Sequence, residues 1–358
     1  MKRRSIYWIA VFLPLLVWSC GGKDPLPDLI PPPPTPSGEE GGQGGGGDTP
    51  PAWEANRGKV VRPSAGNGWT VSSVREGITY YAYSGKDAVT GVNQEAYAVD
   101  VDLSNPKYKV ELTYTIPAAV TSDVHKNHNA IATINAGYEA GSIFIRVNGT
   151  NKSAIPNTQI STTGVPNWKS EAAFFCDGVR NVSIAGAGEF IRPYKAPDDY
   201  QNLVTKQRNF YLQRSDKYLI SSSPMLLDDY NPVGETFIDN TINNWSSLNS
   251  EHPQYHQRKR HPRTAVAMTH DNHLILFVVD GRTTGKREGM SAKELTQFLV
   301  KYFNPQYALN LDGGGSTAMC VEGLGNAETH LVNTPCDSGG REDKQRARDT
   351  HIVILAAE

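Results

Sequence analysis

An acid followed by three glycines is the feature of this sequence that most strongly suggests chemistry. The stretch ALNLDGGGSTAM, residues 308–319, places Asp312 after an apolar run, then Gly313 to Gly315, then Ser316 and Thr317. Because glycine has no Cβ, its backbone N–H group can approach a ligand closely, and successive amides in such a turn form a concave anion site. The two hydroxyls add donors and favour a short helix start, which also attracts anions. The pattern predicts an oxyanion beside Asp312, with a tight structural turn as the alternative.

A second acid lies in a similar setting. Asp280 follows the apolar run 274–279 and begins the sequence Asp280-Gly281-Arg282. If the strand before it and the strand before Asp312 are parallel neighbours joined by a helix, both acids emerge at the same sheet edge. We therefore expect the two carboxylates to face one pocket. The alternatives are that Asp280 only caps a turn, as Asp-Gly commonly does, and that Arg282 lies beyond it.

The periodicity of the folded part predicts a β-rich scaffold. Apolar and polar residues alternate over 97–103 and 108–116, and apolar strands are expected over 263–268, 273–279 and 351–355. One helix begins after Ser291, which forms a capping box with Glu294, and ends before Asn304-Pro305. A weaker helix is expected over 122–129. Together these elements predict an α+β fold, a single β-rich domain with a large mixed sheet and a few helices.

The first part of the chain predicts export and a membrane tether. Residues 1–20 have a basic start, a short apolar stretch and a small-residue end, which is typical of a signal peptide. Their last residues, Val17 to Cys20, resemble a bacterial lipobox, so Cys20 is expected to carry a lipid; simple secretion with cleavage near Ser19 is the alternative. Residues 21–55 are rich in proline and glycine and predict a disordered tether, followed by a folded domain over 56–358. The expected location is the bacterial cell envelope.

Composition excludes some classes of partner and leaves one question open. The formal net charge of −2 argues against a nucleic-acid binder. The histidines show no metal-binding spacing, and we expect neither a metal nor a cofactor. Cys320 and Cys336 could bridge in an oxidising compartment, whereas the alternative is that they and Cys176 are buried free thiols.

Several separated motifs resemble those of the phosphodiester glycosidases, the family of the N-acetylglucosamine-1-phosphodiester α-N-acetylglucosaminidase type. They are NLDGGGSTAM, preceded by HPRTAVAM and VVDGR at these separations, and the resemblance runs from about Tyr80 to the C-terminus. Looser matches cover 223–226, 332–335 and Arg346. The family typically has Asn-Gly-Gly followed by two aromatics, whereas this chain has INAGYEA, with Ala136 in place of glycine and Glu139 in place of an aromatic.

The resemblance implies hydrolysis of a glycosyl phosphodiester at the anomeric carbon, releasing free sugar and a phosphomonoester. A carboxylate must attack that carbon or activate water, and arginines and backbone amides can stabilise the phosphate. The candidate catalytic residues are Asp312, Asp280, Arg263 and Glu139. The candidate phosphate- and sugar-binding residues are Gly313, Gly314, Gly315, Ser316, Thr317, Arg282, Asn135 and Asn333, the two asparagines facing sugar hydroxyls.

Two other functions fit the same residues. A non-catalytic glycan-binding lipoprotein would use the aromatic residues as stacking platforms. A phosphodiesterase would cut the P–O bond instead of the C–O bond. The expected partners are a glycosyl phosphodiester or phosphorylated glycan as substrate and a membrane through the lipid anchor.

The anchor is directly testable. Cys20→Ser removes the residue that would carry the lipid, so the variant should move from the membrane fraction to the soluble fraction. Fractionation of cells expressing either form, followed by immunoblotting, measures this. Equal retention of both forms in the membrane would contradict a lipid anchor at Cys20.

Overall fold

The computed structural model describes residues 51, 53–155, 168–187, 197–235, 241–337, 340–342 and 344–357. The expected signal peptide, Cys20 and the tether up to residue 50 lie outside these residues. All the described residues belong to one compact unit, Gly47–Glu358. Among them, no helix has the length and apolar character needed to cross a bilayer.

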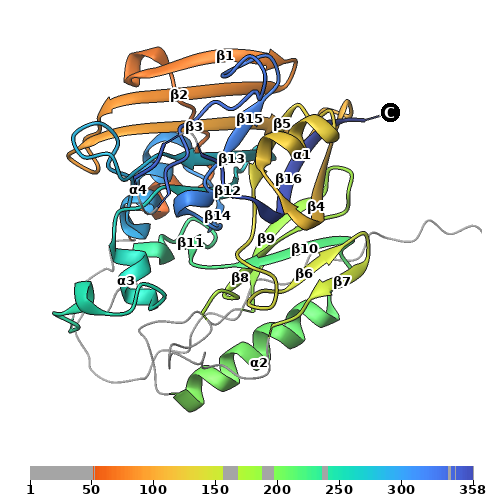
Figure 1. Cartoon of the computed structure of the whole chain (residues 1–358), viewed down its shortest axis with the longest axis vertical. Coiled ribbons are helices and arrows are strands. Elements are labelled where there is room, and N and C mark those ends of the chain that lie inside the picture. The colour runs from red at the N-terminus through yellow and green to blue at the C-terminus, as the bar shows by residue number, and fades with distance from the viewer. Residues whose placement is uncertain are drawn as a thin grey trace, which may run out of the picture. The chain divides into compact units, whose positions relative to one another are not determined.

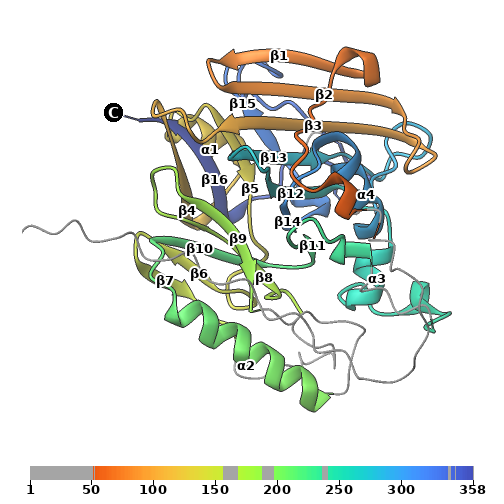
Figure 2. The same cartoon turned by 180° about the vertical axis from the view of Figure 1, so that it is seen from behind.

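The expected α+β class, β-rich with few helices, is confirmed. The largest sheet has seven strands, and its first three lie side by side along one end of the unit (Figures 1 and 2). In spatial order the strands are β1 (Trp69–Arg75), β2 (Ile78–Lys86), β3 (Asn93–Asp102), β13 (His273–Val279), β12 (Arg263–Met268), β14 (Tyr307–Asn310) and β11 (Met225–Leu227).

The strand pairing differs from the expected mixed sheet in one detail. Neighbouring strands of the described sheets all pair antiparallel. β13 and β14 are not neighbours, because β12 lies between them and pairs antiparallel with both. They therefore run in the same direction, and their C-terminal ends still reach one edge of the sheet.

Two smaller sheets pack against one face of the large sheet. Their apolar residues join those of β3, β12 and β13 in the main core. The four-stranded sheet contains β15 (Met319–Val321), β5 (Ala132–Asn135), β16 (Arg348–Ala356) and β4 (Tyr108–Ala119) in that order. The five-stranded sheet contains β7 (Thr150–Ser153), β6 (Ile145–Val147), β10 (Tyr218–Ser222), β8 (Ala172–Cys176) and β9 (Val182–Gly186).

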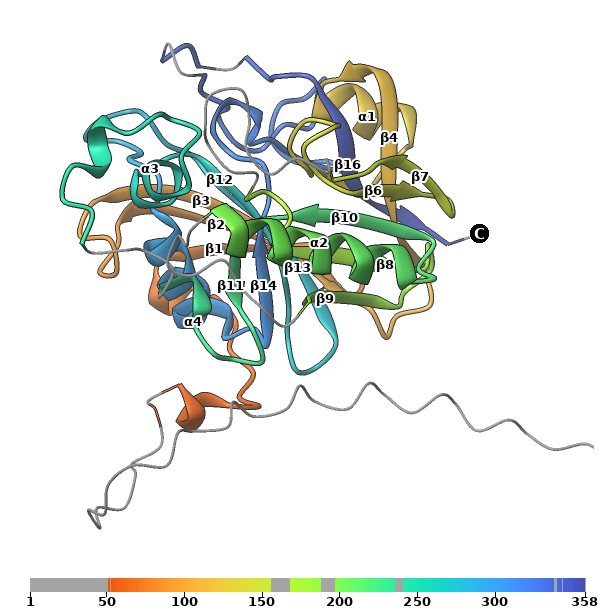
Figure 3. The same cartoon turned by 90° about the horizontal axis from the view of Figure 1, so that it is seen from below.

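Helix α4 (Ala292–Phe303) covers the opposite face of the large sheet, where Phe298 and Phe303 pack on Trp69 and Phe277. The predicted capping box is present, since Ser291 Oγ accepts from Glu294 N and Glu294 Oε2 accepts from Ser291 N. The other helices are α1 (Thr121–Asn127), near the weaker helix expected, α2 (Pro197–Gln213) and α3 (Pro253–Arg258), with 3-10 turns at Glu54–Asn56, Ala65–Asn67, Val233–Glu235, Trp245–Ser247 and Gly314–Ser316. Figure 3 shows α2 lying across the five-stranded sheet.

The open question about the cysteines is answered by their state in the fold. Cys176, Cys320 and Cys336 are all buried free thiols. Cys320 lies in β15, where its backbone pairs with Thr133 of β5. The short loop that a Cys320–Cys336 bridge would have closed is therefore held by backbone pairing and not by a disulfide.

Candidate active site

Three predicted site residues meet at one edge of the large sheet. Arg263 opens β12 and pairs with Val279, so it lies where β13 ends and Asp280 follows. Asn310, at the end of β14, pairs with Ala265 of β12, and Asp312 follows Asn310 by two residues. Side chains alternate between faces along a strand, however, so Asp280 points with Val278 into the main core whereas Arg263 points to the opposite face. A shared edge therefore does not bring the three side chains into one pocket.

Each glycine of the triplet is required by a different neighbour. A Cβ at Gly313 would lie 2.6 Å from the carbonyl oxygen of Pro262. Gly314 has φ +63°, and its Cβ would lie 2.8 Å from Nη2 of Arg282. A Cβ at Gly315 would lie 2.6 Å from Nη2 of Arg346. At distances below about 3 Å, a side chain fits only if its neighbour moves. The turn therefore consists of glycines because two guanidinium groups and one backbone segment pack against it.

The turn offers donors to an anion, although not all three amides take part. Gly314 N is occupied, because it donates to Pro262 O at 2.8 Å. The amides of Gly313 and Gly315 donate to no other residue within the described part of the chain. Two free amides, one on each side of the occupied Gly314 amide and both beside two guanidinium groups, still form an anion-attracting surface. The expectation of three amide donors is therefore corrected to two.

Arg282 and Arg346 are the cations over this turn. Arg282 donates from Nη1 to Cys336 O at 3.0 Å, and its Nη2 is 3.5 Å from His261 Nδ1. Its φ of +69° is unfavourable for a residue with a side chain, and such strain concentrates at functional sites. Arg346 is exposed and, among the described residues, forms no hydrogen bond or ion pair. Both guanidinium groups thus keep donors available for a ligand.

Asp312 is buried with an unusual partner. Its Oδ2 lies 2.6 Å from Nε of Arg348. The Nε–H of Arg348 is directed at Ser316 Oγ, 2.7 Å away, so the contact with Asp312 is an ion pair and Oδ2 accepts no hydrogen bond from any described residue. Burial raises the pKa of Asp312 above its ordinary value, against the charge of Arg348 and the Ser316 hydroxyl, which lower it. A desolvated carboxylate with an unused lone pair can accept a proton or attack carbon.

Asp280 has no such freedom. It is fully buried, Oδ1 accepts from Asn333 Nδ2 at 2.8 Å, and Oδ2 accepts from Thr334 N at 2.8 Å. Burial raises the pKa of Asp280 to about 7 despite these two donors. Both oxygens are committed to the segment that follows β15, so Asp280 is a structural carboxylate and the expected common pocket with Asp312 is not what the contacts show.

The two asparagines expected to bind sugar hydroxyls instead hold the ends of the glycine turn. Asn135 donates from Nδ2 to Asp312 O at 2.7 Å, and its Oδ1 accepts from Thr264 Oγ1 at 2.8 Å and Ala318 N at 3.1 Å. Asn333 donates to Asp280 and to Thr317 O, and accepts from Met319 N at 2.8 Å. The side-chain amides of both asparagines thus form their hydrogen bonds with other groups of the protein.

Arg263 is likewise committed to the scaffold. Its guanidinium is fully buried and donates to three carbonyl oxygens, those of Met290 at 2.9 Å, His256 at 2.6 Å and Lys259 at 3.0 Å. Burial lowers the pKa of Arg263 to about 10. The residue joins α3 and the chain after it to β12, and its Nη1 lies 3.4 Å from His256 Nδ1, so most of its donors are used inside the protein.

Glu139 occupies the other side of Asp312. Its exposed carboxylate accepts from Lys169 Nζ at 2.8 Å, and Lys169 also pairs with Glu251 at 3.0 Å. Burial acts to raise the pKa of Glu139, but the charge and hydrogen bond of Lys169 outweigh it and leave the pKa below its ordinary value. The charges of both Glu139 and Lys169 act on Asp312. Glu139, ranked last among the acids, is thus the acid that shares the surroundings of Asp312.

Aromatic rings line the same side. Tyr138 packs on Trp168 with ring centroids 5.7 Å apart, and Trp168 packs on His256 at 4.9 Å. Burial and the charge of Arg263 lower the pKa of His256 well below its ordinary value, so its imidazole is neutral. The result is a neutral aromatic wall next to the Glu139–Lys169 pair.

Sequence reasoning named Arg282 and Arg346 but missed two other cations of this site, Arg348 and Lys169. Arg348 was placed outside the final strand, which was expected to begin at His351 but begins at Arg348. The alternation of Arg346 and Arg348 along an extended chain was the available signal, since residues two apart lie on one side of it. Lys169 lies in a connection with no motif, and nothing in the local sequence marks it.

Comparison with known proteins gives a family and three similar structures. Residues 128–355 match the family described as phosphodiester glycosidase. A hypothetical protein from Synechocystis is 14% identical, with 81% of this chain and 64% of that chain covered and a TM-score of 0.48. The catalytic domain of zebrafish N-acetylglucosamine-1-phosphodiester α-N-acetylglucosaminidase, auto-inhibited by its pro-peptide, is 19% identical, covering 80% and 87%, with a TM-score of 0.48. A putative exported protein from Burkholderia pseudomallei is 12% identical, covering 74% of each chain, with a TM-score of 0.43. No curated protein matches the sequence significantly.

The glycine turn predicts a specific pair of outcomes for two Gly→Ala variants. Gly314→Ala displaces Arg282, which removes a charge-assisted hydrogen bond worth ~1.5–3 kcal/mol and should weaken inorganic phosphate binding by ~10-fold or more. Gly323→Ala is the matched control, because Gly323 also has a left-handed φ, +71°, but nothing lies within 4 Å of its Cβ. Calorimetric titration with phosphate measures both. Equal phosphate affinity in the two variants would contradict an anion site at the turn.

The buried acid predicts a pH dependence of stability. An unfolded aspartate titrates near ~3.9, whereas the pKa of Asp280 in the fold is about 7. Between these values the folded chain holds a proton that the unfolded chain has released, so this residue's contribution to stability falls as the pH rises through the window. Asp280→Asn removes the titrating group. Urea unfolding at about pH 5 and about pH 8 should show a smaller loss of unfolding free energy in the variant than in the wild type. An identical loss in both would show that Asp280 is ionised throughout.

Proposed function

Because the chain belongs to the phosphodiester glycosidase family, we propose that it hydrolyses a glycosyl phosphodiester at the anomeric carbon, releasing free sugar and a phosphomonoester. One observation carries this proposal. A buried carboxylate oxygen of Asp312 without a hydrogen-bond donor lies directly before a glycine turn that two arginines approach. A group that can attack carbon and a group of donors for a phosphate are therefore adjacent in the chain.

The phosphate half of the substrate would bind at the glycine turn. The free amides of Gly313 and Gly315 and the guanidinium groups of Arg282 and Arg346 supply donors to its oxygens. Negative charge on these oxygens grows as the glycosidic bond breaks, so donors fixed there stabilise the transition state more than the bound substrate. Arg282 in particular is held by Cys336 O before the substrate arrives, which removes the cost of orienting it.

The attacking half is Asp312. In a retaining course its carboxylate attacks the anomeric carbon, and water later hydrolyses the glycosyl intermediate; in an inverting course it takes a proton from the water that attacks. In either course the C–O electron pair leaves with the phosphate. A phosphomonoester is a far better leaving group than an alcohol, so no strong general acid is needed. The charge of Arg348 opposes the rise in the pKa of Asp312 that burial causes, and the ion pair holds the carboxylate in place.

The sugar would lie between Asp312 and the Glu139–Lys169 pair. Tyr138, Trp168 and the neutral His256 form the wall beside that pair. Glu139 is exposed and sits where the family typically carries an aromatic residue, so a hydrogen-bonding carboxylate replaces a ring at the rim. We infer that this change alters which sugar hydroxyls or substituents are accepted. In an inverting course, Glu139 is also the second carboxylate whose charge acts on Asp312.

We further propose that the enzyme works at the bacterial cell envelope. The support is the lipobox-like sequence ending at Cys20 and the proline- and glycine-rich tether after it. A tether of this composition would let the catalytic domain reach substrates away from the membrane surface.

Asp312→Asn tests the assignment. The change keeps the size of the side chain and removes its charge, so turnover of a glycosyl phosphodiester should fall by roughly 10²-fold or more, as expected for loss of a nucleophile or base. Asp123→Asn, at an exposed position in the first turn of α1, is the control and should keep full activity. Initial rates of sugar release and melting curves are measured on the same samples. Full activity in a folded Asp312→Asn protein would remove Asp312 from the mechanism.

Hydrolysis in ¹⁸O-labelled water then separates the possible reactions. Cleavage of the C–O bond places the label in the free sugar, whereas a phosphodiesterase that cuts P–O places it in the phosphate. Binding of the substrates without any hydrolysis would instead identify a glycan-binding protein.

A further inference from the structure

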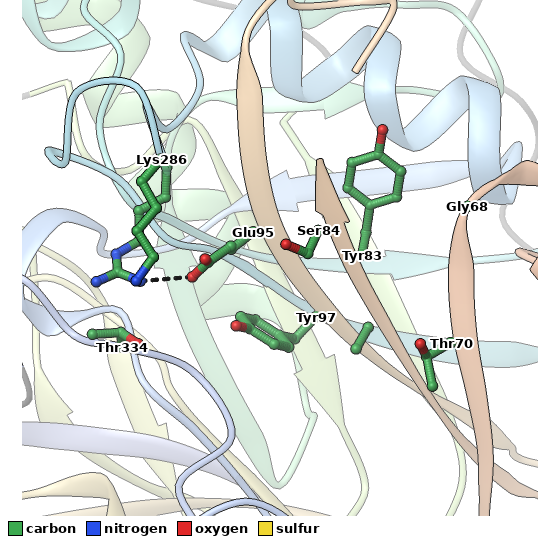
Figure 4. Close-up of a pocket in the computed structure, with 10 residues that line it drawn as sticks. Gly68, Thr70, Tyr83, Ser84, Glu95, Tyr97, Lys286 and Thr334 are labelled. Carbon is green, nitrogen blue, oxygen red and sulfur yellow. Dashed lines mark hydrogen bonds and ion pairs between the residues drawn. The ribbon is translucent and has the colours of Figure 1, made fainter. Parts of the chain in front are cut away.

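A cavity of about 390 Å³, whose lining does not include Asp312, lies against β1, β2 and β3 at the open end of the large sheet (Figure 4). Its floor is one row of side chains across three strands, because Thr70 of β1 pairs with Ala82 of β2, and Ala82 pairs with Tyr97 of β3. Ser84 and Glu95 form the next row. Residues directly opposite on adjacent strands share a face, so these side chains all point into the cavity.

A buried ion-pair chain forms one wall. Arg287 is almost fully buried and donates from Nη1 to Glu95 at 2.7 Å and from Nη2 to Glu342 at 2.7 Å. The charge of Glu95 is therefore balanced by an ion pair where it meets the cavity, and Figure 4 draws the interaction of Glu95 as a dashed line. Thr334 closes the side nearest the glycine turn, and Lys286 stands at the rim.

The polar groups around this cavity lack partners in the protein. The hydroxyls of Thr70, Ser84, Tyr97 and Thr334 and the ammonium of Lys286 form no hydrogen bond or ion pair with any residue that the structure describes. Four hydroxyls and an ammonium line the cavity together with two tyrosines, Tyr83 and Tyr97, and a small floor residue, Ala82. The volume falls within the ~300–1,000 Å³ typical of small-molecule sites, but the lining is far more polar than such sites usually are.

We propose that this cavity is a second saccharide-binding site, distinct from the site at Asp312. A sugar ring combines a CH-rich face, which packs on an aromatic side chain, with hydroxyls that pair with donors and acceptors around it. Tyr97 would supply the platform, and the free hydroxyls would supply the hydrogen bonds. Lys286 forms no ion pair with any described residue, although its charge acts on Glu342, so a sugar with an acidic substituent should bind more tightly than a neutral one.

The position of the cavity suggests how it would serve the chain. The segment 333–337 separates it from the glycine turn: Thr334 lines the cavity and donates to Asp280, while Cys336 O holds Arg282. A glycan held here would lie on the other side of that segment from the anion site. The site would thus retain a glycan-rich substrate or surface near the enzyme, and its binding does not depend on the reaction proposed for Asp312.

Isothermal titration calorimetry tests the proposal. The full-length protein is titrated with neutral chitotetraose and, separately, with acidic tetragalacturonic acid. Tyr97→Ala should weaken binding of both by ~10-fold or more through loss of the stacking surface. Tyr114→Ala is the matched control, because Tyr114 of β4 is also partly buried at the main core but lies outside the cavity. Thr70→Glu, at an exposed position of edge strand β1, fills the cavity mouth without opening the core and should also abolish binding of the acidic ligand. Lys286→Ala should weaken only the acidic ligand.

The outcomes separate this site from the catalytic proposal. Binding that survives Asp312→Asn and is lost in Tyr97→Ala and Thr70→Glu supports the second site, whether or not the wild type hydrolyses any phosphodiester. The second site is overturned if neither tetrasaccharide binds the wild type. It is also overturned if tetragalacturonic acid binds the wild type and Thr70→Glu equally, even if hydrolysis is demonstrated.

Discussion

The side-chain amide of Asn135 is the interaction on which the rest of the site depends. One residue at the end of β5 donates to Asp312 O and accepts from Thr264 and Ala318, so it joins the four-stranded sheet, the large sheet and both ends of the glycine turn. A buried amide whose partners are all present is strongly favoured over one left unpaired, because no water replaces a missing partner. The hydrogen bonds of the Asn135 side chain, and not the sequence of the turn alone, therefore position the turn.

The side-chain amide of Asn333 plays a similar part at the C-terminal end of the glycine turn. Asn333 connects Asp280 with Thr317 and Met319, and the fully bonded Asp280 in turn holds Thr334. Burial raises the pKa of Asp280 to about 7, and the hydrogen bonds from Asn333 and Thr334 oppose this rise only in part. The protein keeps one carboxylate, Asp312, beside the anion-binding turn, and uses the other to fix the segment that carries the arginine-binding carbonyl of Cys336.

What the sequence predicted well is local or follows from chain direction. Helix α4 carries its capping box and apolar period within a dozen residues, and β12 and β13 are read from their own apolar runs. The convergence of Asp280 and Asp312 at one edge needed only two strands of the same direction. The short, fully buried β5 and β8 gave no alternating pattern, so they were missed.

The roles of the site residues could not be read in this way, because they depend on partners from distant segments. Asn135, Asn333 and Arg263 have the right chemistry for a ligand, and only the tertiary structure shows that their polar atoms are already used. Arg348 reaches Asp312 through the pairing of β16 with β5, and Lys169 reaches Glu139 across thirty residues of chain. Residue type predicted the kind of site, and long-range pairing decided which residues form it.

The neighbours of the three glycines also constrain how this family member can diverge. Position 314 is closed by the side chain of Arg282 as well as by its own φ, and position 315 by the side chain of Arg346. A lineage that shortened Arg346 would remove the closest contact at position 315 and leave only the Cα of Asp337, 3.2 Å from a new Cβ, to shift slightly. Substitutions at these two positions are therefore linked, and their order matters. Position 313 has no such route, because the atom that blocks it belongs to the backbone of Pro262, which no side-chain replacement removes. Gly315 can therefore be replaced during evolution once Arg346 has been shortened, whereas Gly313 cannot be replaced by this route.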